Sequence, residues 1–285
     1  MPELPEVETV VRNLREPLIG RAFTGVSVLW NRTVARPSVD ALRQLLPGLR
    51  VRAIQRRAKY LVFELGRGPG ETATDYLLIH LKMSGRLDVA PHEKPIDKHD
   101  RVIFDLDDGR QLRFNDTRKF GRVCLVADPE EVTGHLGPEP LGEGFTLAAF
   151  KKSLAGRAGR LKPLLLDQTF VAGLGNIYAD EALWLARLHP LRRADSLSAV
   201  EVRALYRGIR RALRDGLRSN GASFDRVYPG GRYQHSFRVY DRAGQACRRC
   251  QQPIRRIVVG QRGTHFCANC QRGPRATRKS ARSKA

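Results

Sequence analysis

The sequence predicts a two-domain α/β protein, in which an N-terminal helix and an antiparallel β-sandwich precede a helical domain that ends in a zinc-binding β-hairpin. Three observations support this prediction. Short segments of alternating polar and apolar residues dominate the first half of the chain. The apolar spacing becomes helical in the second half. Four cysteines near the C-terminus form two closely spaced pairs, which is typical of a metal site.

The first predicted element is a helix that begins near Pro5 and ends near Gly20. Proline suits the first turn of a helix, and the acidic Glu3 and Glu6 suit the positive end of the helix dipole. Apolar residues then repeat with helical spacing at Val7, Val10, Val11 and Leu14. A helix start alone explains the two glutamates, but it does not explain the proline at position 2.

Pro2 suggests a chemical role for the chain end. A small second residue lets the initiator Met1 be removed, which leaves the secondary amine of proline at the N-terminus. Attack by that amine on a sugar aldehyde carbon gives an iminium with no N–H proton to lose, so its positive charge is permanent. An α-amine titrates near pH 8, which leaves a usable neutral fraction. Glu3 and Glu6 could then serve as a general acid and a positioning carboxylate.

Strands are predicted after this helix because short segments alternate between polar and apolar residues. The sequence Asp107-Asp108-Gly109 is a hairpin turn signal between two of them. The strands are expected to form a sandwich or a barrel flanked by the N-terminal helix. The predicted strands are Val51–Ile54, Tyr60–Leu65, Tyr76–Leu81, Arg101–Leu106, Gln111–Phe114 and Arg122–Val126.

The domain boundaries follow from changes in composition. Residues 128–146 are rich in proline, glycine and acid, and Ser198 with Glu201 forms a capping box that opens a later amphipathic helix. The predicted parts are a helix and sandwich at 1–130, a linker at 131–145, a helical domain at 146–234, a zinc hairpin at 235–271 and a disordered basic tail at 272–285.

The cysteines predict one structural zinc ion. Two CxxC pairs separated by sixteen residues can bring four thiolates to one tetrahedral ion. Disulfides are the alternative, but charged residues throughout the first fifteen positions are untypical of a signal peptide, so we expect a reducing compartment. The four predicted ligands are Cys247, Cys250, Cys267 and Cys270, whereas Cys124 is expected in a buried strand.

The net charge indicates a polyanionic partner. Lysine and arginine total 51 against 29 acidic residues, which gives +22. Nucleic acid is the leading candidate, and a membrane surface is weaker because no long apolar span is present. Residues 271–285 contain six basic and no acidic residues, which predicts a disordered arm that attracts nucleic acid. A hydrophobic content of 41% permits two ordinary cores.

Four further motifs lie between the N-terminal segment and the cysteines. These are Lys59 after Arg56-Arg57-Ala58, the segment His80–Gly85, the segment Asn115–Gly121 and the segment Gly173–Tyr178. Together with Pro2, Glu3, Glu6 and the cysteines, they make the chain resemble the formamidopyrimidine-DNA glycosylase family of bacterial DNA repair enzymes. The resemblance runs from Pro2 to Gln271, and the motifs occur in the family's order.

The resemblance implies specific roles for catalytic residues. Pro2 corresponds to the nucleophile that attacks C1′ of the damaged nucleotide, and Glu3 to the proton donor that opens the deoxyribose ring. Glu6 corresponds to a positioning carboxylate. Lys59 matches a catalytic cation of the β-elimination step, and Arg262 matches a zinc-hairpin arginine that binds phosphates and assists δ-elimination.

The resemblance also implies DNA contacts. Met83, Arg118 and Phe120 match residues inserted into the duplex after the damaged base is extruded. Apolar and aromatic side chains recover part of the lost stacking, and arginine can satisfy an orphaned cytosine. The remaining DNA-contacting positions are His80, His99, Arg157, which is commonly lysine in the family, and Asn176 of a helix–two-turn–helix.

We therefore expect a bifunctional glycosylase and AP lyase for oxidised purines, with damaged duplex DNA as partner and zinc as the only cofactor. Leu4 favours this branch over the endonuclease VIII-like branch for oxidised pyrimidines. The segment Gly221–Gly231 is shorter than the usual loop over the flipped base, which favours ring-opened purines over 8-oxoguanine. A non-catalytic zinc-finger binder is the other alternative. The expected form is a monomer in the bacterial cytoplasm, associated with the nucleoid.

Overall fold

The computed structural model describes residues 1–68, 72–223 and 230–273, and it divides into two compact units. The sandwich unit contains Met1–Phe145, Asp167–Gly175 and Leu213–Ser236. The zinc unit contains Thr146–Leu166, Asn176–Ala212 and the chain from Phe237 onward. Two segments from the second half of the chain therefore fold with the first half. The domain ranges predicted from the sequence rest on changes in composition rather than on compactness, and they stay a prediction.

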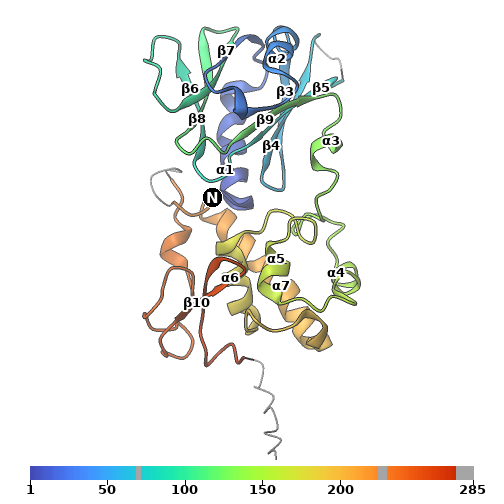
Figure 1. Ribbon diagram of the computed structural model, residues 1–285, viewed down its shortest axis with the longest axis vertical. Coiled ribbons are helices and arrows are strands. Elements are labelled where there is room, and N and C mark those ends of the chain that lie inside the picture. The colour runs from blue at the N-terminus through green and yellow to red at the C-terminus, as the bar shows by residue number, and fades with distance from the viewer. Residues whose placement is uncertain (69–71, 224–229, 274–285) are drawn as a thin grey trace, which may run out of the picture. The chain divides into compact units, whose positions relative to one another are not determined.

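The sandwich unit is built from two sheets and three helices (Figure 1). One sheet has the order β1 (Phe23–Val28), β7 (Asp100–Leu106), β8 (Arg110–Asp116) and β6 (Gly85–Pro91). The other has the order β2 (Val34–Arg36), β9 (Arg122–Val126), β5 (Asp75–His80), β4 (Tyr60–Gly66) and β3 (Arg50–Arg57). The helices are α1 (Leu4–Leu18), α2 (Val39–Leu45) and α3 (Glu130–Thr133), with a 3-10 turn at Asn31–Thr33.

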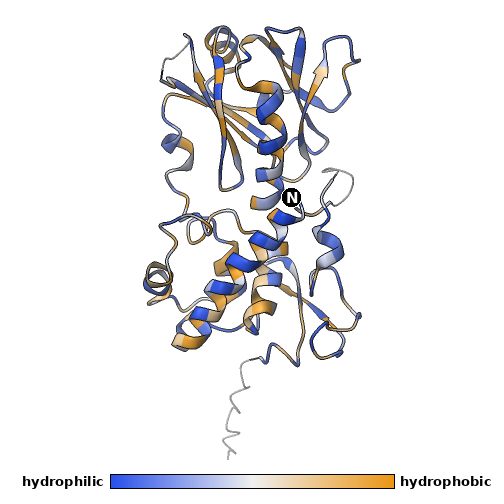
Figure 2. Cartoon of the chain, turned by 180° about the vertical axis from the view of Figure 1, so that it is seen from behind, coloured by the Kyte–Doolittle hydropathy of each residue, from blue (hydrophilic) through white to orange (hydrophobic). Residues whose placement is uncertain are grey.

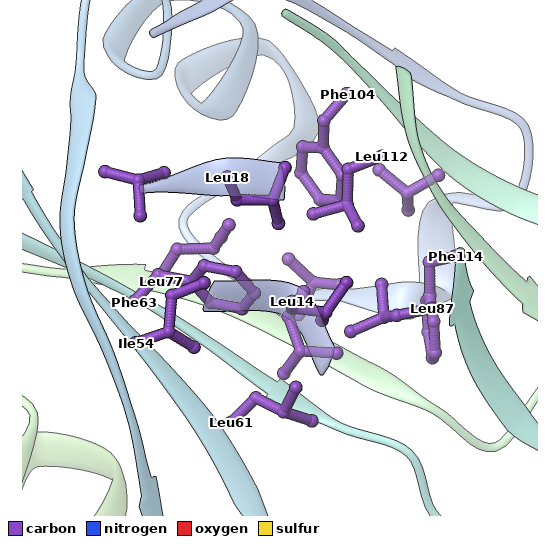
Figure 3. Packing of buried hydrophobic residues seen from close by; sticks show 14 of the residues in the cluster. Leu14, Leu18, Ile54, Leu61, Phe63, Leu77, Leu87, Phe104, Leu112 and Phe114 are labelled. Carbon is purple, nitrogen blue, oxygen red and sulfur yellow. The ribbon is translucent and has the colours of Figure 1, made fainter. Parts of the chain in front are cut away.

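The core of this unit lies where α1 meets both sheets. Leu14 and Leu18 of α1 pack among Ile54 and Phe63 of one sheet and Phe104 of the other, as Figure 3 shows. Each of these five side chains is at most 4% exposed. Figure 2 shows the corresponding alternation of apolar and hydrophilic residues along the strands. The predicted helix and sandwich are therefore confirmed.

All six predicted strands are present, and the pairs between neighbouring strands are antiparallel except for β2 with β9, which is parallel. Three strands, β1, β2 and β6, were not predicted from the sequence. β1 contains Gly25, where the register with β7 shifts, and β6 begins at Gly85 and ends at Pro91. Glycine and proline weaken the strand signal, so these segments are recognised only through their partners.

The zinc unit is helical with one hairpin. Ser198 and Glu201 exchange the two hydrogen bonds of a capping box, at 3.3 and 2.8 Å, so the predicted start of α7 is confirmed. The elements are α4 (Leu147–Leu154), α5 (Leu161–Leu166), α6 (Asn176–Ala186), a 3-10 turn at Ala194–Ser196, α7 (Ala199–Arg218), and strands β10 (Arg255–Val259) and β11 (Arg262–Phe266). The last turns of α7 and a 3-10 turn at Tyr233–Ser236 belong to the sandwich unit.

None of the helices in the described ranges has the length and apolar character needed to cross a bilayer.

Candidate active site

Glu3 and Glu6 cap the N-terminus of α1. Glu3 caps the helix, and its backbone N–H donates to Glu6 Oε2 at 2.8 Å in a reciprocal capping box. Both residues are 2% exposed. Pro2 lies directly before this cap and is buried. The two carboxylates are therefore fixed beside the chain end rather than displayed on a solvated helix face.

Two glycines let backbone approach these carboxylates. Gly175 N–H donates to Glu3 Oε2 at 2.7 Å, and Ala222 N–H donates to Glu6 Oε1 at 2.7 Å. A Cβ on Gly175 would lie 2.4 Å from Glu3 Cδ, and one on Gly221 would lie 2.7 Å from Glu6 Oε1. Gly221 also has a φ of +75°, which glycine adopts without strain.

Gly173 is the third glycine that lies against the first turn of α1, and we call Gly173, Gly175 and Gly221 together the glycine seat of this turn. The Gly173 carbonyl accepts the Leu4 N–H at 3.1 Å, its φ is +86°, and a Cβ there would lie 2.8 Å from Leu4 Cδ1. Within the sandwich unit, Gly173 and Gly175 therefore allow backbone to approach the first turn of α1.

Lys59 is held at the same place. It is 4% exposed, and its ammonium group donates to the Leu174 carbonyl at 2.6 Å. Gln168 Nε2 donates to that carbonyl at 2.8 Å, and Gln168 Oε1 accepts the Gly173 N–H at 3.0 Å. Leu174 therefore links Lys59 to the peptide that contacts Glu3, so the structure brings Glu3, Glu6 and Lys59 together.

Glu139 supports the turn that presents Lys59, and sequence reasoning missed it. Its carboxylate accepts hydrogen bonds from Arg56 at 2.8 Å, from Arg57 at 3.3 Å and from the Ala58 N–H. Ala58 has a φ of +53°, an uncommon conformation for alanine that these bonds help to maintain. The Pro-Glu-Pro sequence in an acidic loop gave no local signal for this contact.

Asp116 joins the two loops that carry the predicted insertion residues. This residue is 1% exposed, and its carboxylate accepts hydrogen bonds from Ser84 Oγ, from the Arg118 N–H at 3.1 Å and from the Gly121 N–H at 2.7 Å. Met83 precedes Ser84, and the guanidinium of Arg118 lies 5.2 Å from the ring centre of Phe120. Phe120 is 46% exposed, unlike a core aromatic residue.

His99 belongs to the same cluster. Its carbonyl accepts the Asp116 N–H at 2.9 Å, and its Nδ1 lies 3.1 Å from Arg101 Nη2. Arg101 Nε also donates to the Asp116 carbonyl at 2.7 Å. Asp116 is therefore the common anchor of the segments around Met83, His99 and Arg118, although the sequence marked it only as part of a loop motif.

His80 is a neutral imidazole at the end of β5. Burial, together with the positive charges of Lys82 and Lys59, lowers the pKa of His80 to about 3. Its Nδ1 accepts the Lys82 N–H at 2.9 Å, and its ring packs edge-on against Tyr60 at 4.6 Å between centroids. Because Nδ1 accepts, the proton of the neutral ring lies on Nε2, which leaves one N–H donor for a phosphate.

The zinc unit brings Asn176 and Arg262 to neighbouring positions. Asn176 begins α6 and its Nδ2 donates to the Gly263 carbonyl at 2.9 Å. Arg262 is exposed and starts β11 after a two-residue turn of Gly260 and Gln261, which both have positive φ as a type I′ turn requires. Arg157 is exposed after α4, and its Nε donates to the Ser153 carbonyl at 3.3 Å.

Two consecutive acids of α6 hold the hairpin segment, and the sequence gave no sign of them. Asp180 is fully buried and accepts a hydrogen bond from Lys162 and one from the His265 N–H at 2.9 Å. Glu181 is also fully buried, and its Oε1 accepts three consecutive backbone N–H groups, those of Arg238, Val239 and Tyr240, at 2.9 to 3.0 Å. The bond from His265 fixes β11, and therefore Arg262, relative to α6, and the bonds to Glu181 fix residues 238–240 against the same helix.

The four predicted cysteines form one cluster in the zinc unit. Their Sγ atoms all lie within 4.8 Å of one another, with Cys250 and Cys267 3.4 Å apart and Cys247 and Cys270 4.0 Å apart. Tetrahedral Zn–S bonds of about 2.3 Å require S···S separations of roughly 3.8 Å, so the four thiolates fit one zinc ion. Cys124 lies apart, buried in β9.

The protonation of the cluster supports the same conclusion. Burial and the adjacent thiols raise the pKa of Cys270 to about 12, whereas a hydrogen bond from Asn269 is the main cause that lowers the pKa of Cys250 to about 6. Four thiols this close cannot all ionise without a cation, and a Zn²⁺ ion supplies that charge. The Trp184 indole N–H also donates to Cys247 Sγ at 3.4 Å.

Known protein families match nearly the whole chain. Residues 1–123 match the formamidopyrimidine-DNA glycosylase N-terminal domain, residues 136–227 its H2TH domain, and residues 244–273 the zinc finger found in FPG and IleRS. Formamidopyrimidine-DNA glycosylases of Roseiflexus sp. and Herpetosiphon aurantiacus are 48% and 45% identical, over 95% of this chain and 100% of theirs. The chain belongs to the formamidopyrimidine-DNA glycosylase family.

Solved structures of the family have the same fold. The Lactococcus lactis enzyme, as a mutant with Fapy-dG DNA and in a complex with abasic-site DNA, matches with a TM-score of 0.88 and 36% identity. Each match covers 95% of this chain and all of the other. The predicted fold, family and structural zinc are confirmed, and neither the endonuclease VIII-like nor the non-catalytic alternative is favoured.

Two predictions fall partly outside the described residues. In the short loop Gly221–Gly231, residues 224–229 are not described, and in the basic tail residues 274–285 are not described.

The close contact between Gly175 and the Glu3 carboxylate can be tested with Gly175→Ala. The added methyl group would displace the Glu3 carboxylate, so single-turnover base excision should fall by roughly 10²–10⁴-fold, the range for loss of a general acid. The melting temperature should fall, because overpacking a buried site costs about 1–3 kcal/mol, but lesion binding by the folded protein should change little. Gly144→Ala is the matched control, because nothing lies within 4 Å of the added Cβ. Normal excision by Gly175→Ala would contradict the assignment of Glu3.

The state of His80 can be tested by NMR. An unperturbed imidazole titrates near pH 6.5, but the His80 ring should keep its neutral chemical shifts from pH 8 to pH 5. Because the unfolded chain binds this proton below pH 6.5 and the native chain does not, His80 should cost stability progressively as the pH falls from 6.5 towards 3. A His80 titration midpoint near 6.5 would overturn the buried, neutral arrangement.

The zinc site can be tested with Cys250→Ala. Structural zinc contributes on the order of 10–16 kcal/mol of apparent binding free energy in finger peptides, so the variant should lose both its zinc and the ordered hairpin. The sandwich unit should stay folded. Cys124→Ala should keep one zinc per chain. Metal analysis and Trp184 fluorescence provide the two readouts, and full zinc content in Cys250→Ala would refute the ligand set.

Proposed function

We propose that this chain is a bifunctional DNA glycosylase and AP lyase that excises oxidised purines through a Schiff base of Pro2. The observation that carries the proposal is the convergence of two buried carboxylates and one buried ammonium at the start of α1, directly after Pro2. A helix cap alone requires neither a buried lysine beside it nor three glycines packed against the first turn. A nucleic-acid binder without catalytic activity would require none of these groups.

The proposed reaction begins with the amine. After removal of Met1, the Pro2 nitrogen attacks C1′ of the damaged nucleotide, and the bond from C1′ to the base breaks. Glu3 donates the proton that opens the deoxyribose ring, and Glu6 holds the N-terminal backbone and positions the sugar. The iminium then acidifies the C2′ protons, so that the 3′ phosphate leaves by β-elimination and the 5′ phosphate by δ-elimination.

Cationic groups serve the elimination steps in this proposal. Lys59 acts in β-elimination beside Glu3, and Arg262 binds phosphate and assists δ-elimination. Asn176, His80, His99 and Arg157 supply further phosphate and backbone contacts. The zinc ion keeps the hairpin folded and takes no part in a reaction step.

When a base is extruded from the duplex, side chains must occupy the space that it leaves. Removing a nucleotide from the stack costs a few kcal/mol, and Met83 with Phe120 recover part of it by occupying the void. Arg118 satisfies the orphaned base. The shared Asp116 anchor supports this proposal, because it fixes the loops of Met83 and Arg118 against each other before DNA binds.

The proposed substrates are ring-opened formamidopyrimidines and abasic sites, with 8-oxoguanine as a further substrate. Related structures contain Fapy-dG DNA, abasic-site DNA and carbocyclic 8-oxo-G DNA, which supports this range. We further propose that the protein acts as a monomer on the DNA of a bacterial cytoplasm, and the source organisms of the relatives named above support the bacterial origin.

Iminium trapping tests the proposed nucleophile. A variant that keeps Met1, or that carries any residue before Pro2, lacks the secondary amine and should form no borohydride-stable adduct with abasic-site duplex. Its affinity for the same duplex should stay close to that of the processed protein. Electrophoresis after reduction measures the adduct, and normal adduct yield from the extended protein would exclude Pro2 as the nucleophile.

A further inference from the structure

The zinc unit carries a basic groove at the end opposite to Asn176. Two adjoining hollows of about 510 and 840 Å³ share Arg192 and Arg272 in their walls. Arg187 and Arg249 line the first hollow, and Arg160 lines the second. Guanidinium groups match phosphate oxygens in geometry and charge, so the groove has the chemistry of a phosphate site.

Three of these arginines have no acidic partner in the part of the chain that the structure describes. Arg192 pairs with Glu201 at 3.2 Å, and Arg249 stacks on Trp184 with its guanidinium 3.9 Å from the ring centre. By contrast, Arg160, Arg187 and Arg272 are exposed and form no ion pair within the described ranges. The groove therefore combines fixed arginines with uncompensated ones.

Arg187 occupies a backbone position that favours glycine. It follows the last residue of α6 with a φ of +59°, and its N–H donates to the Trp184 carbonyl at 3.1 Å. The next N–H, of Leu188, donates to the Leu183 carbonyl at 3.0 Å, which completes a Schellman motif. Glycine is the usual residue here, because a side chain at positive φ is strained. A strained arginine facing a groove suggests a function other than helix capping.

The groove lies apart from the proposed phosphate contacts of Asn176 and Arg262, whereas Arg157 directly precedes Ala158 in the wall of the second hollow. Asn176 begins α6 and Arg187 follows its end, so eleven helical residues, or about 16 Å, separate the two. The hairpin shows the same separation, because Arg262 lies next to its turn whereas Cys250 and Cys270 line the groove at the zinc end. One phosphate group cannot bridge the two ends of α6.

We propose that this groove binds the phosphate backbone of a second DNA segment while the first segment occupies the active site. Two joined hollows with arginines along both favour an extended polyanion over a single small anion. The composition of the chain agrees with a polyanion, since five more basic residues follow Gly273 in the sequence. A protein with two such sites could pass between DNA segments without first becoming free.

Arg187→Gly separates this proposal from a structural role. Glycine relieves the positive φ, so the melting temperature should stay equal or rise, whereas binding of the second segment should weaken. Arg187→Asn provides a second variant that tolerates this backbone conformation. Arg43→Ala on α2 removes the same charge from an exposed residue of the sandwich unit and is the matched control.

The test uses energy transfer between two labelled duplexes. A donor-labelled lesion duplex and the full-length protein are mixed at equal concentrations, and an acceptor-labelled undamaged duplex is then added. Wild-type protein and Arg43→Ala should give energy transfer, and Arg187→Gly should lose most of it while donor anisotropy still reports a bound lesion duplex. The slope of log affinity for the second duplex against log salt should fall by about 0.9 for each lost phosphate contact.

Four results would overturn the proposal. The first is the absence of energy transfer from wild-type protein under salt conditions that keep the lesion duplex bound. The second is an equal effect of Arg187→Gly and Arg43→Ala, and the third is a lower melting temperature of Arg187→Gly, which would indicate a capping role. The fourth is competition by inorganic phosphate at Arg187 without binding of a second duplex, which would indicate a small-anion site only.

Discussion

The fit of the first turn of α1 against glycine-bearing backbone is the constraint on which the proposed active site depends. Two buried carboxylates would be costly without partners. Glu3 receives the N–H of Gly175 and Glu6 receives the N–H of Ala222, and an added Cβ on Gly175 or on Gly221 would collide with these acids. The positions of the two acids therefore require glycine at 175 and 221. The acids in turn lie beside Pro2, where the proposed reaction needs them. The Leu174 carbonyl adds Lys59 to the same group.

Buried and half-buried acids hold the proposed site residues of both units in place. In the sandwich unit, the buried Asp116 anchors the loops of Met83 and Arg118, and the half-buried Glu139 supports the turn before Lys59. In the zinc unit, Asp180 accepts the N–H of His265 in β11, the strand that carries Arg262. In a chain with a net charge of +22, Arg118 and Arg262 remain exposed beside these anchors, so their charge is directed towards solvent.

The sequence was sufficient for features that have local signals. The CxxC pairs predicted the zinc site because four thiolates can complete one tetrahedral ion. Pro5 with the acids of the first turn, and the capping box at Ser198, predicted two helix starts. The roles of Asp116, Glu139 and Glu181 were not predictable, since each acts on backbone far away in the chain. The partners of Gly173 and Gly175 were also missed, because contact with α1 arises only when the sandwich unit folds.

In the proposed reaction, the amine of Pro2, and not that of Lys59, attacks the sugar. Peptide mapping by mass spectrometry of the borohydride-reduced adduct with abasic-site DNA distinguishes the two amines. The deoxyribose remnant should be attached to the Pro2 nitrogen, with Lys59 unmodified because its ammonium group is held by the Leu174 carbonyl. Attachment at Lys59 Nζ would refute Pro2 as the nucleophile.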